Sequence, residues 1–187
     1  MDLPNVWTRW AHYFKDSLRT HVRGILTRNP EWEDALIGYE LESAWMVGAW
    51  DDVKVMTERA PSQTEQVVMA RVLLAMRSGN SNATAESLRT ARNILGGPIA
   101  AAGVAGYRRA YEAVLNLHLM HELEAIHNAI AIFPSDSQPG SQAQRRQILA
   151  MLSHNLTARL DATLPTFRTR EPILSMRRTA FALTFVY

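Results

Sequence analysis

Residues 107–133 read YRRAYEAVLNLHLMHELEAIHNAIAIF, and this stretch carries the strongest structural signal in the chain. Its apolar residues recur every three or four positions, which is typical of an α-helix with one buried face. The side chains on that face are Tyr111, Leu115, Leu119, Ile126, Ile130 and Phe133. We therefore expect a long helix that packs against other elements along most of its length.

The remainder of the 187-residue chain shows the same periodicity, and no run alternates as a strand would. Helices are predicted over residues 5–27, 31–47, 51–59, 62–77, 83–95, 107–133, 141–161 and 171–185. Turns are predicted at Asn29-Pro30, Gly48, Pro61-Ser62, Ser78-Gly79-Asn80, Gly96-Gly97-Pro98 and Pro165-Thr166. Short turns return successive helices antiparallel, so the sequence predicts an all-α fold of antiparallel hairpins stacked as a tetratricopeptide- or HEAT-like α-solenoid.

Three local signals refine this prediction. Ser62 and Glu65 have the spacing of a capping box, and Asp51 is expected to be the N-cap of its helix. Pro172 is expected in the first turn of the last helix, where a missing N–H is tolerated. We predict a single helical-repeat segment over residues 1–187, with a surface loop over residues 134–141.

The net charge of +2 conceals an uneven distribution. Residues 31–58 hold eight acidic side chains and one base, whereas residues 145–178 hold seven arginines and two acids. We expect these to be solvated helix faces whose partners lie partly within the same stack. A surface that binds an acidic partner is the alternative.

Composition limits the possible chemistry. The chain has no cysteine, which excludes disulfides, thiol nucleophiles and thiolate metal sites. Its least polar stretch, residues 93–107, is interrupted by glycine and proline and is too short to span a membrane. Trp7, Trp10 and Phe14 have the spacing of a packed helix face, so we expect them to pack rather than bind nucleic acid.

The histidines and glutamates of residues 118–127 are candidate metal ligands. Glu124 and His127 form a Glu-x-x-His unit, but di-iron bundles need a second unit and this sequence has none. The spacing of His118 and Glu122 instead predicts a hydrogen bond within one helix. Nucleophile-elbow, phosphate-loop and protein-kinase motifs are all missing, so we expect no catalytic activity and no cofactor or metal.

Residues 39–53, YELESAWMVGAWDDV, have the form of a tetratricopeptide-like helix–turn–helix. They resemble the Ala-Trp-x-Leu-x-x-Trp-Asp element in the FAT domain of the ATR-type checkpoint kinases, which are phosphatidylinositol-kinase-related protein kinases. Met46 and Asp52 depart from that pattern, where a basic and an apolar residue are usual.

Two further stretches resemble the same domain in the same order. They are residues 106–124 and residues 158–178, of which the second ends in Arg170-Glu-Pro-Ile-Leu-Ser-Met-Arg177-Arg178. This last pattern is the most specific. The chain thus resembles a FAT-domain fragment without the kinase domain.

The resemblance implies a noncatalytic helical scaffold in a nuclear DNA-damage kinase. Its implied partners are the kinase domain of the parent chain, a second kinase protomer and an ATR-interacting partner protein, with no small molecule, membrane or direct nucleic acid. The residues singled out for structure or interaction are Trp45, Trp50, Asp51, His118, Glu122, Arg168, Arg170, Glu171, Pro172, Arg177 and Arg178.

Two alternatives remain at this point. The chain could be a free-standing tetratricopeptide-like adaptor that binds peptides or acidic partners through its basic C-terminal third. The arginines of residues 168–178 could contact a partner, although hydrogen bonds between helices are the favoured interpretation. A fragment of a repeat array also exposes core-like surface, so we expect self-association.

Overall fold

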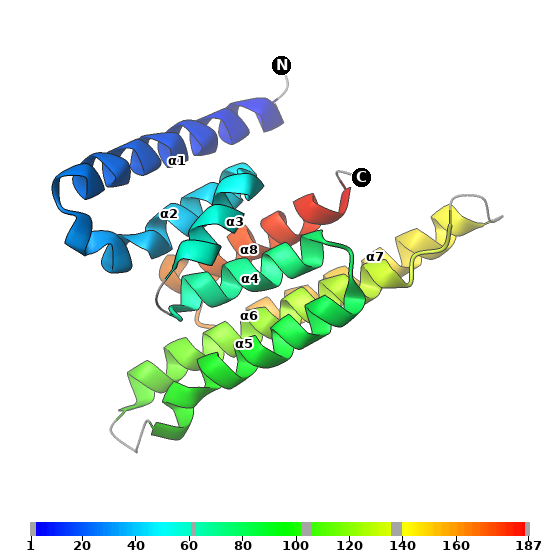
Figure 1. The fold of residues 1–187 in the computed structure, drawn as a ribbon. Helices are drawn as coiled ribbons and strands as arrows, with labels where there is room; N and C mark the ends of the chain where they lie inside the picture. Colours follow the sequence, from blue (N-terminus) through cyan, green and yellow to red (C-terminus); the bar gives the residue numbers. More distant parts are fainter. Residues whose placement is uncertain (1–2, 61–62, 102–105, 136–139, 186–187) are drawn as a thin grey trace. The chain divides into compact units, whose positions relative to one another are not determined.

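The computed structural model describes residues 3–60, 63–101, 106–135 and 140–185, without the side chains of residues 3–15, 100–101, 107–109 and 184–185. Every regular element in these ranges is helical, which confirms the all-α prediction (Figure 1). The elements are α1 (Leu3–Arg28), the 3-10 helix η1 (Pro30–Trp32), α2 (Glu33–Val47), α3 (Trp50–Arg59), α4 (Glu65–Arg77), α5 (Ser81–Ala101), α6 (Tyr107–Ala131), α7 (Ser141–Asp161) and α8 (Phe167–Phe185). The predicted packing of Trp7, Trp10 and Phe14 falls outside the described side chains.

The chain divides into two compact units, Met1–Ser78 and Gly79–Tyr187, called here the N-terminal and C-terminal units. In the N-terminal unit, α2 contacts α1, α3 and α4. The core there includes the fully buried side chains of Leu41, Val53, Val67, Val72 and Leu73. Helix α2 is thus the central element of this unit.

In the C-terminal unit, α6 occupies the corresponding position and contacts α5, α7 and α8 (Figure 1). Leu119 and Ile126 from the predicted stripe are buried, but so are Met120 and Leu123, which the stripe omits. A helix with three neighbours is apolar on several sides, so a search for one apolar face finds only part of its core. Whether residues 1–187 act as one segment stays a prediction.

Two predicted turns are present as glycines in the left-handed region. Gly48 (φ 78°) ends α2, and its backbone N–H bonds to the carbonyls of the last turn. Gly79 (φ 70°) separates α4 from α5. Only glycine adopts this conformation without steric cost, which is why the sequence signal was reliable here.

Both predicted N-caps need correction. The N-cap of α4 is Thr64, whose hydroxyl accepts a hydrogen bond from the N–H of Val67, while Ser62 lies outside the described residues. Helix α3 begins at Trp50 after Ala49, which places Asp51 in the first turn rather than at the cap. An acidic side chain in the first turn still interacts favourably with the helix dipole.

Two of the predictions that involved proline are wrong, although Pro165-Thr166 does lie between α7 and α8 as predicted. Gly96, Gly97 and Pro98 do not form a turn but lie within α5, which continues to Ala101. Pro172 is not in the first turn but is the sixth residue of α8, which begins at Phe167. Both helices pack on α6, and such contacts outweigh the cost of one or two unfavourable residues.

Replacing Gly48 with alanine is expected to lower the unfolding free energy of the N-terminal unit by about 1 kcal/mol, because alanine is strained at φ 78°. Gly24 provides a control of opposite sign. It is helical and has open space where a Cβ would stand, so Gly24→Ala is expected to stabilise by up to about 1 kcal/mol. Urea unfolding measures both, and equal effects would contradict the assignment of strain to Gly48.

Candidate functional site

Glu122 is the most deeply buried acidic side chain that the structure describes, with 2% of its side chain exposed. It lies in the middle of α6, at the centre of the C-terminal unit. A carboxylate in such a position is strongly destabilising unless it is paired and hydrogen-bonded. Its charged and polar neighbours are His118 of α6, Arg159 of α7 and Arg177 of α8. We call these three side chains and Glu122 the Glu122 cluster.

Arg177 of α8 donates two hydrogen bonds to the Glu122 carboxylate. Its Nε donates to Oε2 at 2.6 Å and one terminal nitrogen donates to Oε1 at 2.7 Å. The same terminal nitrogen donates to the backbone carbonyl of Leu156 in α7 at 2.6 Å. These bonds connect α6, α7 and α8 through one guanidinium. Only 12% of the Arg177 side chain is exposed.

His118 and Arg159 complete the cluster. His118 Nε2 lies 2.8 Å from Glu122 Oε1, so the hydrogen bond that their spacing predicts is present. His118 Nδ1 lies 3.2 Å from a terminal nitrogen of Arg159, whose Nε is 3.9 Å from the same Oε1. A guanidinium nitrogen only donates, so Nδ1 must accept and Nε2 must carry the proton.

The charge balance of the cluster keeps the imidazole neutral. Burial lowers the pKa of His118, and the positive charges of Arg159 and Arg177 lower it further, while Glu122 acts in the opposite direction. One carboxylate already faces two guanidinium groups, so a third cation has no counter-charge within the cluster. The His118 imidazole is therefore uncharged at neutral pH.

The other singled-out residues of α8 have smaller roles. Arg168 is 90% exposed and pairs with the exposed Glu112 at 3.3 Å, a contact worth little. Arg170 donates weakly to the carbonyl of Thr163 at 3.4 Å. Glu171 accepts from the hydroxyl of Ser175 within the helix. Pro172 and Arg178 are exposed.

The three singled-out residues of the N-terminal unit surround the Gly48 turn. Trp45 is buried in the core, whereas Trp50 is half-buried with the Arg77 guanidinium 5.7 Å from its ring centroid. Asp51 is exposed. The tryptophans thus hold the corner between α2, α3 and α4, and Asp51 makes no contribution to that packing.

The acidic stretch of residues 31–58 finds basic partners within its own unit. Asp52 pairs with Arg19, Glu33 pairs with Arg59 at 3.2 Å, and the buried Glu40 lies 3.5 Å from Arg23. In the C-terminal unit, Arg145 donates to the carbonyl of Pro134. These contacts favour the interpretation that the charged stretches have partners within the fold.

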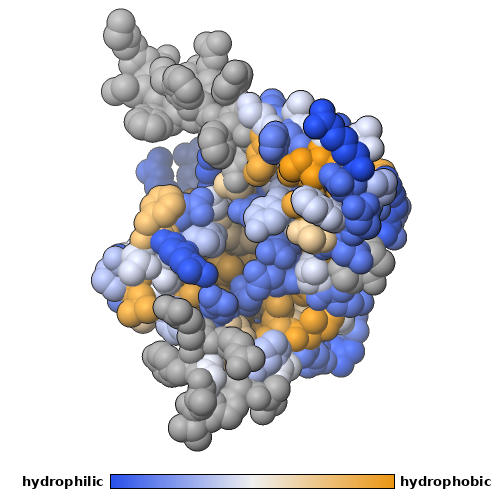
Figure 2. All heavy atoms as spheres, turned by 90° about the vertical axis from the view of Figure 1, so that its left-hand side faces the viewer, coloured by the Kyte–Doolittle hydropathy of each residue, from blue (hydrophilic) through white to orange (hydrophobic). Residues whose placement is uncertain are grey.

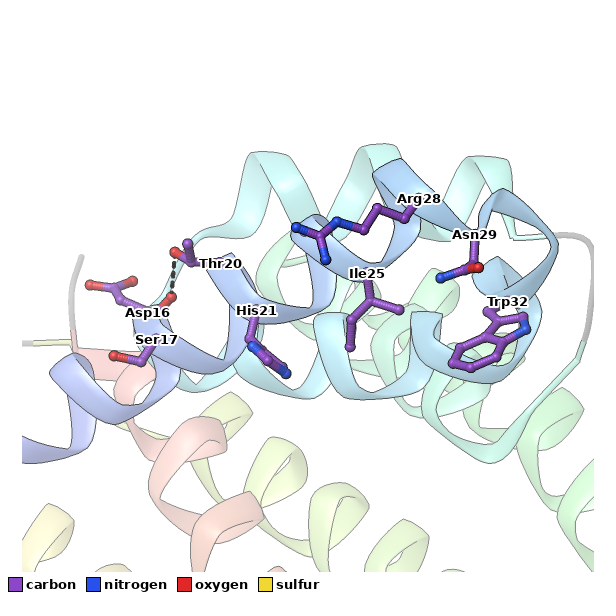
Figure 3. A pocket seen from close by; sticks show the side chains of 9 residues that line it. Asp16, Ser17, Thr20, His21, Ile25, Arg28, Asn29 and Trp32 are labelled. Atoms are coloured by element: carbon purple, nitrogen blue, oxygen red, sulfur yellow. Dashed lines mark hydrogen bonds between the residues drawn. The ribbon is translucent and has the colours of Figure 1, made fainter.

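Surface grooves occur among the described residues of the N-terminal unit. One, of about 820 Å³, runs along one side of α1 to Trp32, with His21, Ile25 and Arg28 between (Figure 3). Another, of about 490 Å³, lies over α2 between Leu26 of α1 and Val55 of α3. Ser17 and His21 line the first groove four positions apart on α1, and Figure 3 shows no hydrogen bond between them.

Exposed apolar side chains mark possible contact surfaces in both units. They are Trp32, Tyr39, Val55, Val114, Ile132, Met151, Leu164, Phe167 and Leu174. On the face shown in Figure 2, hydrophobic residues form small patches separated by hydrophilic ones. Phe167, at 84%, is the most exposed of these side chains and begins α8. Within the described residues, no helix is long and apolar enough to cross a membrane.

Glu124 and His127, which form the Glu-x-x-His unit, do not form a metal site with further ligands in the described part of the chain. Glu124 accepts two hydrogen bonds from Arg92 of α5, at 2.6 and 3.3 Å, and these lower its pKa. Burial lowers the pKa of His127. In the described part of the chain, no three candidate metal ligands gather at one point.

Arg159 belongs to the Glu122 cluster but is not among the residues that the sequence indicated for structure or interaction. It was visible only as one of seven arginines in residues 145–178. Its partner His118 lies 41 positions earlier, and Arg177 lies 55 positions from Glu122. Such pairings carry no periodic signal, so only the fold reveals them.

Comparison with known proteins places this geometry in a family. A family model described as the FAT domain matches residues 38–184, which includes the whole Glu122 cluster. Serine/threonine-protein kinase ATR of Arabidopsis thaliana is 29% identical over 192 residues, covering 96% of this chain and 7% of that protein. Serine/threonine-protein kinase ATR of Oryza sativa subsp. indica is 26% identical over 177 residues, covering 88% and 6%. This chain therefore spans less than a tenth of the length of these relatives, and no solved structure matches it.

Proposed function

Because this chain belongs to the FAT domain family, we propose that it is a noncatalytic helical scaffold segment of an ATR-type DNA-damage checkpoint serine/threonine kinase. The observation that carries the proposal is the match to the FAT domain over residues 38–184, together with relatives named as ATR kinases. A nuclear location and a role in the DNA-damage response follow from the same resemblance and are part of the proposal.

The use of charged groups supports a scaffold rather than an enzyme. The four members of the Glu122 cluster are engaged with one another, and their hydrogen bonds join α6, α7 and α8. A catalytic acid or base must instead reach a substrate. Hydrogen bonds between side chains of different helices hold those helices in register.

The proposed partners are the kinase domain of the parent chain, a neighbouring protomer and an ATR-interacting partner protein. The exposed apolar residues support the presence of protein contacts, since such side chains often anchor interfaces. Phe167 is the strongest candidate anchor because 84% of it is exposed. The adaptor alternative depended on outward arginines, of which Arg177 is buried and bonded to Glu122.

A binding experiment with a separately purified ATR-type kinase domain tests this proposal. We expect the 187-residue chain to form a saturable complex in sedimentation velocity and to transfer no phosphate from radiolabelled ATP by itself. Phe167→Ser is expected to weaken the complex. Met151→Ser is the matched control, because Met151 is also exposed (68%) but lies on α7.

The results separate the candidate functions. Failure to bind the kinase domain up to the solubility limit would contradict the scaffold proposal. Binding to acidic peptides without binding to the kinase domain would favour the adaptor. Phosphate transfer by the isolated chain would contradict the noncatalytic assignment.

A further inference from the structure

We propose that the contact among His118, Glu122 and Arg159 is an acid-sensitive latch that fastens the C-terminal half of α7 to α6. At neutral pH the latch is closed, with the neutral imidazole between the carboxylate and the guanidinium. Protonation of the imidazole opens it. This inference concerns the fold of the C-terminal unit and does not depend on the proposed function.

The direction of the two hydrogen bonds makes the contact sensitive to a proton. Nδ1 of His118 accepts from Arg159 at 3.2 Å while Nε2 donates to Glu122 at 2.8 Å. A proton on Nδ1 removes the acceptor and places a positive imidazolium against a positive guanidinium. Acidification therefore turns an attraction into a repulsion at a single atom.

Charged groups from the neighbouring helices do not offset the added proton. Arg159 comes from α7 and Arg177 from α8, so the only carboxylate in the cluster faces two cations before His118 is protonated. From α5, Arg92 is paired with Glu124, which lies elsewhere on α6. His121 and His154 are exposed, and His127 is half-buried.

Helix α7 is the element that the latch controls, and the latch adds to the one hydrogen bond by which Arg177 holds the Leu156 carbonyl in its C-terminal half. Of the described α7 side chains, Leu152 and Leu156 are buried in that half. Arg177 keeps its two bonds to Glu122 after His118 gains a proton, so α8 stays attached to α6. Arg159, 30% exposed and 3.9 Å from the carboxylate, can turn toward solvent.

Hydrogen–deuterium exchange of the 187-residue chain at pH 7.5 and 5.5 tests the latch. After correction for intrinsic rates, the opening equilibrium of residues 150–161 is expected to rise up to about tenfold on acidification. Residues 84–95 of α5 serve as the internal reference and are expected to change little.

His118→Gln removes the proton site but keeps the contacts. A glutamine amide donates to Glu122 and accepts from Arg159, yet it does not titrate. In this variant the pH response of residues 150–161 is expected to disappear. His154→Gln is the matched control, since His154 is exposed and lies within residues 150–161. The pH response of these residues should remain in this variant.

The proposal would be overturned by a wild-type α7 without a pH response, by a response that survives in His118→Gln, or by one that spreads equally to α5. Nitrogen-15 NMR of the histidines uses the wild-type protein alone, so its result does not depend on whether a variant folds. It should show His118 protonated on Nε2 at pH 7.5, and a proton on Nδ1 instead would equally overturn the latch.

Discussion

Glu122→Leu is expected to destabilise the C-terminal unit by about 3–5 kcal/mol, because it leaves the guanidinium of Arg177 buried without its counter-charge. Arg177 would lose two hydrogen bonds to the carboxylate and keep only the one to the Leu156 carbonyl. Buried donors without partners carry their full desolvation cost.

Urea unfolding followed by circular dichroism measures this effect. All five tryptophans, at positions 7, 10, 32, 45 and 50, belong to the N-terminal unit. Tryptophan fluorescence therefore reports on that unit, and circular dichroism reports on both. In Glu122→Leu, a transition seen by circular dichroism should move to lower urea.

Two controls separate the buried charge from a general effect of mutation. Glu124→Leu removes a carboxylate from the same helix, but its pair with Arg92 is about one-third exposed, so we expect a loss below about 1 kcal/mol. The double change Glu122→Leu with Arg177→Met should recover most of the stability, because apolar side chains replace a buried ion pair at little cost. A single variant as mild as Glu124→Leu would contradict the central role of Glu122.

Leu41→Ala is expected to cost the N-terminal unit about 2–5 kcal/mol. Leu41 is completely buried in α2, the helix that contacts α1, α3 and α4. Its truncation removes apolar contacts and leaves a cavity that three neighbouring helices close only partly. The midpoint of urea unfolding, followed by tryptophan fluorescence, measures the loss.

Tyr39→Ala is the matched control, two positions earlier on the same helix. Tyr39 is 57% exposed, so its loss should change the unfolding free energy by less than about 1 kcal/mol. Similar midpoints for the two variants would show that α2 is not the centre of the core. A loss confined to Leu41→Ala supports the arrangement described here.

His118 and Glu122 illustrate how far local spacing reaches. They are four positions apart on one helix, which is enough to predict their hydrogen bond. Arg177 was singled out by its motif, but no spacing relates it to a carboxylate 55 residues away. Arg159 was not singled out at all, because its partner is visible only when α7 lies against α6.

Gly48 and Pro98 show the same limit in the backbone. The Gly48 turn was predictable because a left-handed φ is a property of the residue itself. Pro98 was expected to end a helix, yet α5 continues past it while packing along α6. Tertiary contacts, worth more than a local preference, decided that boundary.

The sequence by itself determined that this protein is helical, where most of its helices lie, and which stretches resemble a FAT domain, because these depend on residues close together in the chain. The tertiary structure alone decided the length of α5, the start of α8 and the pairing of Arg159 and Arg177 with His118 and Glu122. Burial is the physical reason. A carboxylate finds its counter-charges only after three helices have excluded water from around it.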